Sequence, residues 1–71
     1  MEIRRGIVKG FNGTTYRASV QLAGSLGMWL DEVPVARNIA SGDLVDGRSC
    51  ALVFFDPANP GDAVLIAVYT P

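Results

Sequence analysis

SCALVFFDPANPGDAVLIAVY, residues 49–69, contains two short apolar runs separated by a turn-rich loop. The runs at 49–55 and 63–69 are apolar at almost every position, so neither has a polar face for water. Short runs rich in β-branched and aromatic side chains are typical of β-strands. The loop between them holds two prolines, a glycine and three Asp or Asn residues, which favours a turn of restricted shape. We therefore expect two strands that need cover on both faces.

The N-terminal half of the chain predicts three further strands. Residues 3–11 are rich in β-branched and aromatic side chains and end at Asn12-Gly13, a dipeptide that favours a tight hairpin. In residues 16–22 apolar and polar side chains alternate, which predicts a strand with one buried and one solvated face. Residues 28–33 form the third run, and Pro34 predicts that this strand ends, or reaches a sheet edge, near that point.

Five short strands in a chain of 71 residues leave room for one domain and one core. The segment 35–47 between the third and fourth strands is too short for a stable helix and allows at most one helical turn. An OB barrel has its helix at this place, whereas an SH3-like barrel has a helical turn before its last strand. We predict that residues 1–71 form a single all-β domain, a small five-stranded OB-like barrel, with an SH3-like barrel as the alternative.

The composition argues against catalysis, cofactors and metals. The chain has no histidine, and the adjacent carboxylates Asp31 and Glu32 would point to opposite faces of a strand. Cys50 lies in an apolar run, where burial raises the pKa of a thiol and makes it a poor nucleophile. We expect no enzymatic activity, no catalytic residue, no cofactor and no metal site.

The sequence also lacks the patterns of membrane insertion and export. No run approaches the roughly 20 apolar residues of a membrane helix, and no signal-type apolar core follows the N-terminus. We expect synthesis in the cytoplasm and no membrane partner.

Basic and aromatic side chains in the first three predicted strands offer a second hypothesis. OB barrels bind single strands through cation-lined grooves and aromatic side chains that stack on bases. The net charge of −1 gives no long-range attraction for a polyanion, which argues against nucleic acid as the partner. An oligonucleotide-binding domain is therefore the alternative function, with these candidate residues: Arg4, Arg5, Lys9, Arg17 and Trp29.

An ordered series of short motifs runs through nearly the whole chain. It comprises Gly6-Ile7-Val8, Val20-Gln21-Leu22, Trp29-Leu30, VPVAR at 33–37, GRSCALVFF at 47–55 and DPANPGDAVL at 56–65. The series resembles the OB-fold module of phage baseplate and tail-hub spike proteins. The resemblance implies a non-enzymatic structural module that assembles as identical copies and contacts other tail components. It also implies that the protein ends in a virion or a prophage-derived particle.

The two all-apolar strands predict self-association. A barrel has one interior, so the second face of these strands would lie exposed and require a partner. We expect a homo-oligomer whose interface includes Phe54, Phe55, Leu65 and Tyr69. In the alternative, the segment 35–47 covers that face with Ile39, Leu44 and Val45, and the protein is a monomer.

Overall fold

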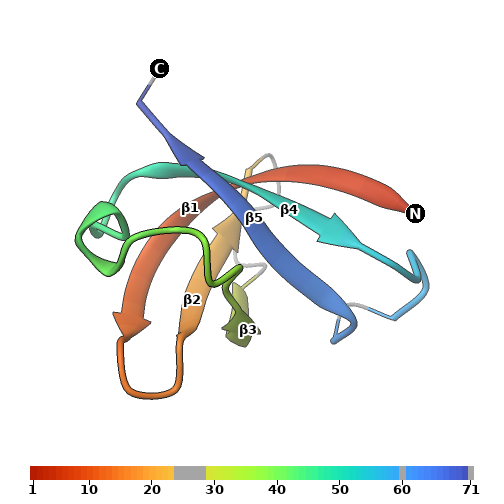
Figure 1. Ribbon diagram of the computed structural model, residues 1–71. Coiled ribbons are helices and arrows are strands. Elements are labelled where there is room, and N and C mark those ends of the chain that lie inside the picture. Colours follow the sequence, from red (N-terminus) through yellow and green to blue (C-terminus); the bar gives the residue numbers. More distant parts are fainter. Residues whose placement is uncertain (24–28, 60, 71) are drawn as a thin grey trace.

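Five antiparallel strands form one sheet in the computed structural model, which describes residues 1–23, 29–59 and 61–70 (Figure 1). The strand order is β3-β2-β1-β4-β5. A single turn of 3₁₀ helix, η1 (Ser41–Asp43), lies between β3 and β4. The strands are β1 (Glu2–Asn12), β2 (Arg17–Leu22), β3 (Trp29–Pro34), β4 (Ser49–Phe54) and β5 (Ala63–Tyr69). The five predicted strands are confirmed within a residue or so at each end, except that residue 28 lies outside the described residues.

The sheet ladders do not close into a barrel, because β3 and β5 form its two edges. The chain just beyond β3 nevertheless reaches β5. Val35 and Leu65 form an isolated parallel bridge, and the backbone amide of Ala36 donates a hydrogen bond to the carbonyl of Leu65 at 2.9 Å. The prediction of a small all-β domain is confirmed, and the two sheet edges are brought together at one point.

Three irregularities in the ladders bend the sheet. Lys9 is an extra residue of β1 relative to β2, next to the position opposite Ser19. On the other side of β2, two residues of β3, Asp31 and Glu32, face the single residue Ser19. Glu32 accordingly has a positive φ of 59°. Ile66 is the extra residue of β5 relative to β4. Bulges of this kind increase twist and curvature, so the sheet curls around its inner face.

The inner face of the curled sheet carries the core. All five strands contribute to it, and the segment after β3 closes it with Val35, Ile39 and Leu44. Ile39 and Leu44 are buried in this core, whereas Val45 is 49% exposed. The alternative in which Ile39, Leu44 and Val45 cover the outer face is therefore wrong, because the two buried residues fill the interior instead.

The hairpin between β1 and β2 is confirmed, but it uses a four-residue loop rather than a tight Asn-Gly turn. The side-chain oxygen of Asn12 accepts hydrogen bonds from the backbone amides of Thr14 and Thr15 at 2.9 and 3.4 Å. The positive φ falls on Tyr16, at 57°, and not on Asn12 or Gly13. The Tyr16 ring packs edge-on against Phe11, and its hydroxyl donates a hydrogen bond to the carbonyl of Ile39. These contacts tie the hairpin to the segment that closes the core.

Candidate functional site

The outer surface of the sheet differs sharply between its two halves. On β2 the inner residues are buried, and the outer positions are Arg17, Ser19 and Gln21, which are all polar. On β4 the corresponding outer positions are Ser49, Ala51 and Val53, of which only Ser49 at the start of the strand is polar. A sheet face exposed to water normally carries the first pattern. The apolar half is therefore the surface that we consider for burial against a partner.

Gly6 fixes which side chains of β1 lie on that apolar half. A Cβ atom at Gly6 would lie 2.6 Å from Cγ1 of Val20 and 3.0 Å from Cδ1 of Leu52, so this position faces the core. Side chains alternate along a strand, and therefore Ile3 and Arg5 lie on the outer face.

Three apolar residues lie side by side across β1, β4 and β5. Ile3 is opposite Val53, and Val53 is opposite Val64. Val53 is only 7% exposed, yet it is not part of the core cluster. Its two cross-strand neighbours therefore cover it from the outer side, which is how aliphatic side chains stabilise adjacent strands.

We call the surface around these residues the outer apolar stripe. It runs across the outer face of β1, β4 and β5 and continues one residue beyond the end of β4. The stripe consists of Ile3, Ala51, Val53, Phe55, Val64, Ile66, Ala67 and Tyr69.

Four large side chains of the stripe are substantially exposed. The exposed fractions are 63% for Ile3, 55% for Phe55 and 39% for both Ile66 and Tyr69. Side chains of this size present up to roughly 150–250 Å² each, so together they expose on the order of 400 Å² of apolar surface. The whole molecule exposes 4255 Å². About a tenth of its surface is thus one apolar region.

The predicted interface residues divide into two pairs. Phe55 and Tyr69 lie on the stripe, and both are exposed. Phe54 and Leu65 are 4% and 0% exposed in the core, so their assignment to an interface is wrong. Strand alternation places the side chain of Phe54 on the inner face of the sheet. The bulge at Ile66 determines that the side chain of Leu65 also lies on the inner face.

The basic residues that were predicted to bind oligonucleotides do not form one cluster. Arg4 lies on the opposite side of β1 from Arg5 and is 4.0 Å from the carboxylate of Glu2. Lys9 and Trp29 do come together, since the Lys9 ammonium is 5.9 Å from the centroid of the Trp29 ring.

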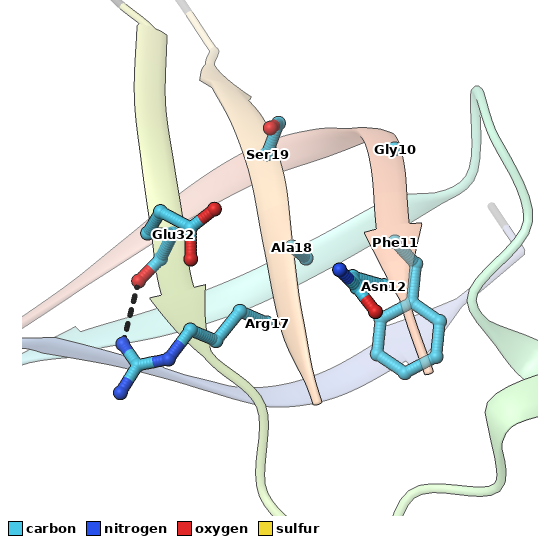
Figure 2. A pocket seen from close by; sticks show the side chains of 7 residues that line it. All are labelled: Gly10, Phe11, Asn12, Arg17, Ala18, Ser19 and Glu32. Carbon is cyan, nitrogen blue, oxygen red and sulfur yellow. Dashed lines mark hydrogen bonds between the residues drawn. The ribbon is translucent and has the colours of Figure 1, made fainter. Parts of the chain in front are cut away.

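Arg17 lines a hollow of about 240 Å³ on the polar half of the sheet (Figure 2). Its guanidinium donates a hydrogen bond to the backbone carbonyl of Glu32 at 3.1 Å. The other lining residues are Gly10, Phe11, Asn12, Ala18, Ser19 and Glu32 itself. The hollow thus offers the Phe11 ring, the Arg17 guanidinium, which already donates a hydrogen bond, and the Glu32 side chain, whose negative charge disfavours a phosphate.

Cys50, the one cysteine of the sequence, lies in the core and not on these surfaces. Cys50 is fully buried, and desolvation raises the pKa of its thiol to about 11, although a backbone hydrogen bond with Gly6 lowers it slightly. Within residues 1–23, 29–59 and 61–70, no three His, Cys, Asp or Glu side chains are grouped so as to hold a metal ion. The same residues include no helix of the length and apolar character that crossing a membrane requires.

Comparison with protein-family models, with curated proteins and with solved structures finds no match for the chain. The resemblance to phage tail-hub modules therefore remains a prediction from the sequence.

Proposed function

We propose that this chain is a non-enzymatic structural module that associates with copies of itself through the outer apolar stripe. The observation that carries the proposal is the exposure of Ile3, Phe55, Ile66 and Tyr69 on one sheet face. The segment between β3 and β4 does not reduce this exposure, because its Ile39 and Leu44 are buried on the inner side and its Val45 is itself exposed.

The architecture within this proposal is an OB-like barrel. The position of η1 between β3 and β4 supports it over an SH3-like barrel, which would have its helical turn before the last strand. The pairing of β1 with β4, which are distant in sequence, and the bridge between Val35 and Leu65 also fit a partly open Greek-key barrel.

The free energy available at the stripe is large for so small a domain. At roughly 25 cal/mol per Å², burying about 400 Å² is worth on the order of 10 kcal/mol before the costs of association. A domain of this size has a folding stability of similar or smaller magnitude. In a dimer the two stripes together bury about 800 Å² of apolar surface, which is below the roughly 1,200 Å² in total of the smallest stable interfaces, so we expect a weak complex with a dissociation constant in the micromolar range or above.

Multi-angle light scattering of the purified protein tests self-association. The proposal predicts that the mean molar mass rises above that of one chain as the concentration increases through the micromolar range. A mass that stays at 7.5 kDa up to millimolar concentration would show that the stripe does not join identical copies.

The setting of this module follows from the resemblance to phage baseplate and tail-hub proteins. In this proposal the chain is made in the cytoplasm, joins other tail-like components, and ends in a virion or a prophage-derived particle. Mass spectrometry of particles purified from the producing cell tests this setting, since the chain should be found in them at a fixed copy number.

Single-stranded oligonucleotide binding is the second candidate function. The contact between Lys9 and Trp29 on the outer surface favours it, because a cation beside an aromatic ring suits a phosphate next to a stacked base. A short single strand should then quench Trp29 fluorescence at low salt, and reversing the charge of Arg17 should weaken the quenching. An unchanged fluorescence signal would exclude this function for Trp29.

A further inference from the structure

The outer apolar stripe carries opposite charges at two of its corners. Arg5 is opposite Ala51 on the outer face of β1. Asp62 lies just before β5, and its carbonyl accepts a hydrogen bond from the backbone amide of Phe55 at 3.0 Å, which extends the β4–β5 ladder by one pair. Asp62 precedes Val64 by two residues, so it belongs to the outer side of the strand.

Neither corner charge forms an ion pair within residues 1–23, 29–59 and 61–70. Among the described residues the ion pairs are Arg4 with Glu2 and Arg48 with Asp43, and neither includes Arg5 or Asp62. Arg5 and Asp62 are two strands apart across the sheet and four residues apart along the strand direction. Their Cα atoms are therefore about 16 Å apart. A salt bridge between them within one chain is therefore out of reach.

The register gives the stripe the form of a grid with three rows. The middle row is Ile3, Val53 and Val64. Arg5 of β1 lies in the row that contains Ala51. Asp62, just before β5, lies in the row that contains Phe55. The two charges thus occupy opposite ends of one diagonal, with Val53 at its centre.

From this grid we infer that the stripe forms a two-fold dimer in which Arg5 of each copy pairs with Asp62 of the partner subunit. The inference rests on the proposed self-association and specifies its geometry. A two-fold axis that lies in the interface, passes over Val53 and is perpendicular to the line from Arg5 to Asp62 exchanges the two charged corners. Each contact in such an interface occurs twice, because the same surface of both copies is used.

The same axis brings the most exposed apolar residues together. It places Ile3, 63% exposed, against Phe55 of the partner subunit, and Phe55, 55% exposed, against the partner's Ile3. It also places Val64 over the partner's Ala51, a large residue against a small one. The two copies of β4 then cross at nearly a right angle, which is one of the two common ways in which sheets pack face to face.

Charge reversal tests the pairing directly. Arg5→Glu and Asp62→Arg each replace two attractions with two repulsions, so each should weaken dimerisation about tenfold. The double variant Arg5→Glu/Asp62→Arg restores opposite charges and should return the dissociation constant to within about threefold of the unmodified protein. Sedimentation equilibrium measures the constants, and circular dichroism confirms that each variant is folded.

Arg4→Glu is the matched control. Arg4 is the chain neighbour of Arg5 but lies on the other side of β1, so its reversal should leave the dissociation constant within about twofold. Single reversals without effect, or a double variant as weak as the sum of the two, would overturn the two-fold pairing and leave self-association itself standing. A monomeric unmodified protein would instead overturn the proposed function, and the pairing with it.

Discussion

Gly6 lies so close to Val20 that a Cβ atom at Gly6 would be 2.6 Å from Cγ1 of Val20. The same Cβ would lie 3.0 Å from Cδ1 of Leu52 and 3.1 Å from the carbonyl oxygen of Gln21. The absence of a side chain at this position lets Val20 of β2 and Leu52 of β4 approach each other over the inner face of β1. Because Gly6 faces the core, strand alternation directs Ile3 and Arg5 to the outer face.

Replacing Gly6 with alanine should therefore destabilise the fold. The extra methyl group overpacks the core, and we expect Gly6→Ala to lower the free energy of unfolding by about 1–3 kcal/mol. Gly10→Ala is the matched control in the same strand, because nothing lies within 4 Å of a Cβ there. Its effect should stay within about 0.5 kcal/mol. Urea denaturation of both variants measures this, and equal losses would contradict the close approach at Gly6.

The hydroxyl of Tyr16 holds the first hairpin against the segment that closes the core. Tyr16→Phe keeps the ring and its contact with Phe11 but removes the hydrogen bond to the carbonyl of Ile39. We expect a loss of about 1 kcal/mol in the free energy of unfolding. Tyr69→Phe is the control, because its hydroxyl makes no hydrogen bond within the described residues and it should be nearly neutral. A neutral Tyr16→Phe would show that the hydroxyl does not fix this segment.

Burial of Cys50 predicts a loss of stability at alkaline pH. The pKa of its thiol rises from 9.0 to about 11, chiefly because of desolvation. The unfolded chain therefore loses the thiol proton first as the pH increases. The contribution of the protonated thiol to the free energy of unfolding is fully present below pH 9. It declines between pH 9 and 11, by at most about 2–3 kcal/mol.

The difference between the unmodified protein and Cys50→Ala isolates the contribution of the thiol to this pH dependence. Denaturation curves at pH 8 and pH 10.5 should show a steeper decline for the protein that retains the thiol. Parallel declines in the two proteins would mean that Cys50 reaches solvent in the folded state.

The strands were predictable because their signals are local. Alternation in β2 assigned Ala18, Val20 and Leu22 to the core, and all three are buried. Pro34 correctly predicted the end of an edge strand, and the turn chemistry of residues 56–62 predicted the loop. There the side chain of Asp56 accepts a hydrogen bond from the amide of Ala58 at 3.0 Å, as expected of an Asx turn.

The candidate site was only half predictable, because its residues come together through register between distant strands. In the sequence, Ile3 is an isolated apolar residue before two arginines. Only the strand register, which pairs Ile3 with Val53, shows that it lies on the stripe. Leu65 could not be assigned to a side without the bulge at Ile66. The unpaired positions opposite Ser19, which curve the sheet, likewise follow from the ladders and not from any local pattern.

Sedimentation equilibrium of the double variant Ile3→Thr/Phe55→Ser, compared with the unmodified protein and with Val45→Thr, tests the central claim most directly. Val45 is a matched control, since it is 49% exposed but lies in the segment before β4 and not on the stripe. The unmodified protein and Val45→Thr should associate equally, and the stripe variant should associate at least about a hundredfold more weakly, because apolar area is lost from both copies. An unmodified protein that remains a monomer, or a stripe variant that associates as strongly as Val45→Thr, would contradict the claim that the outer apolar stripe joins identical copies.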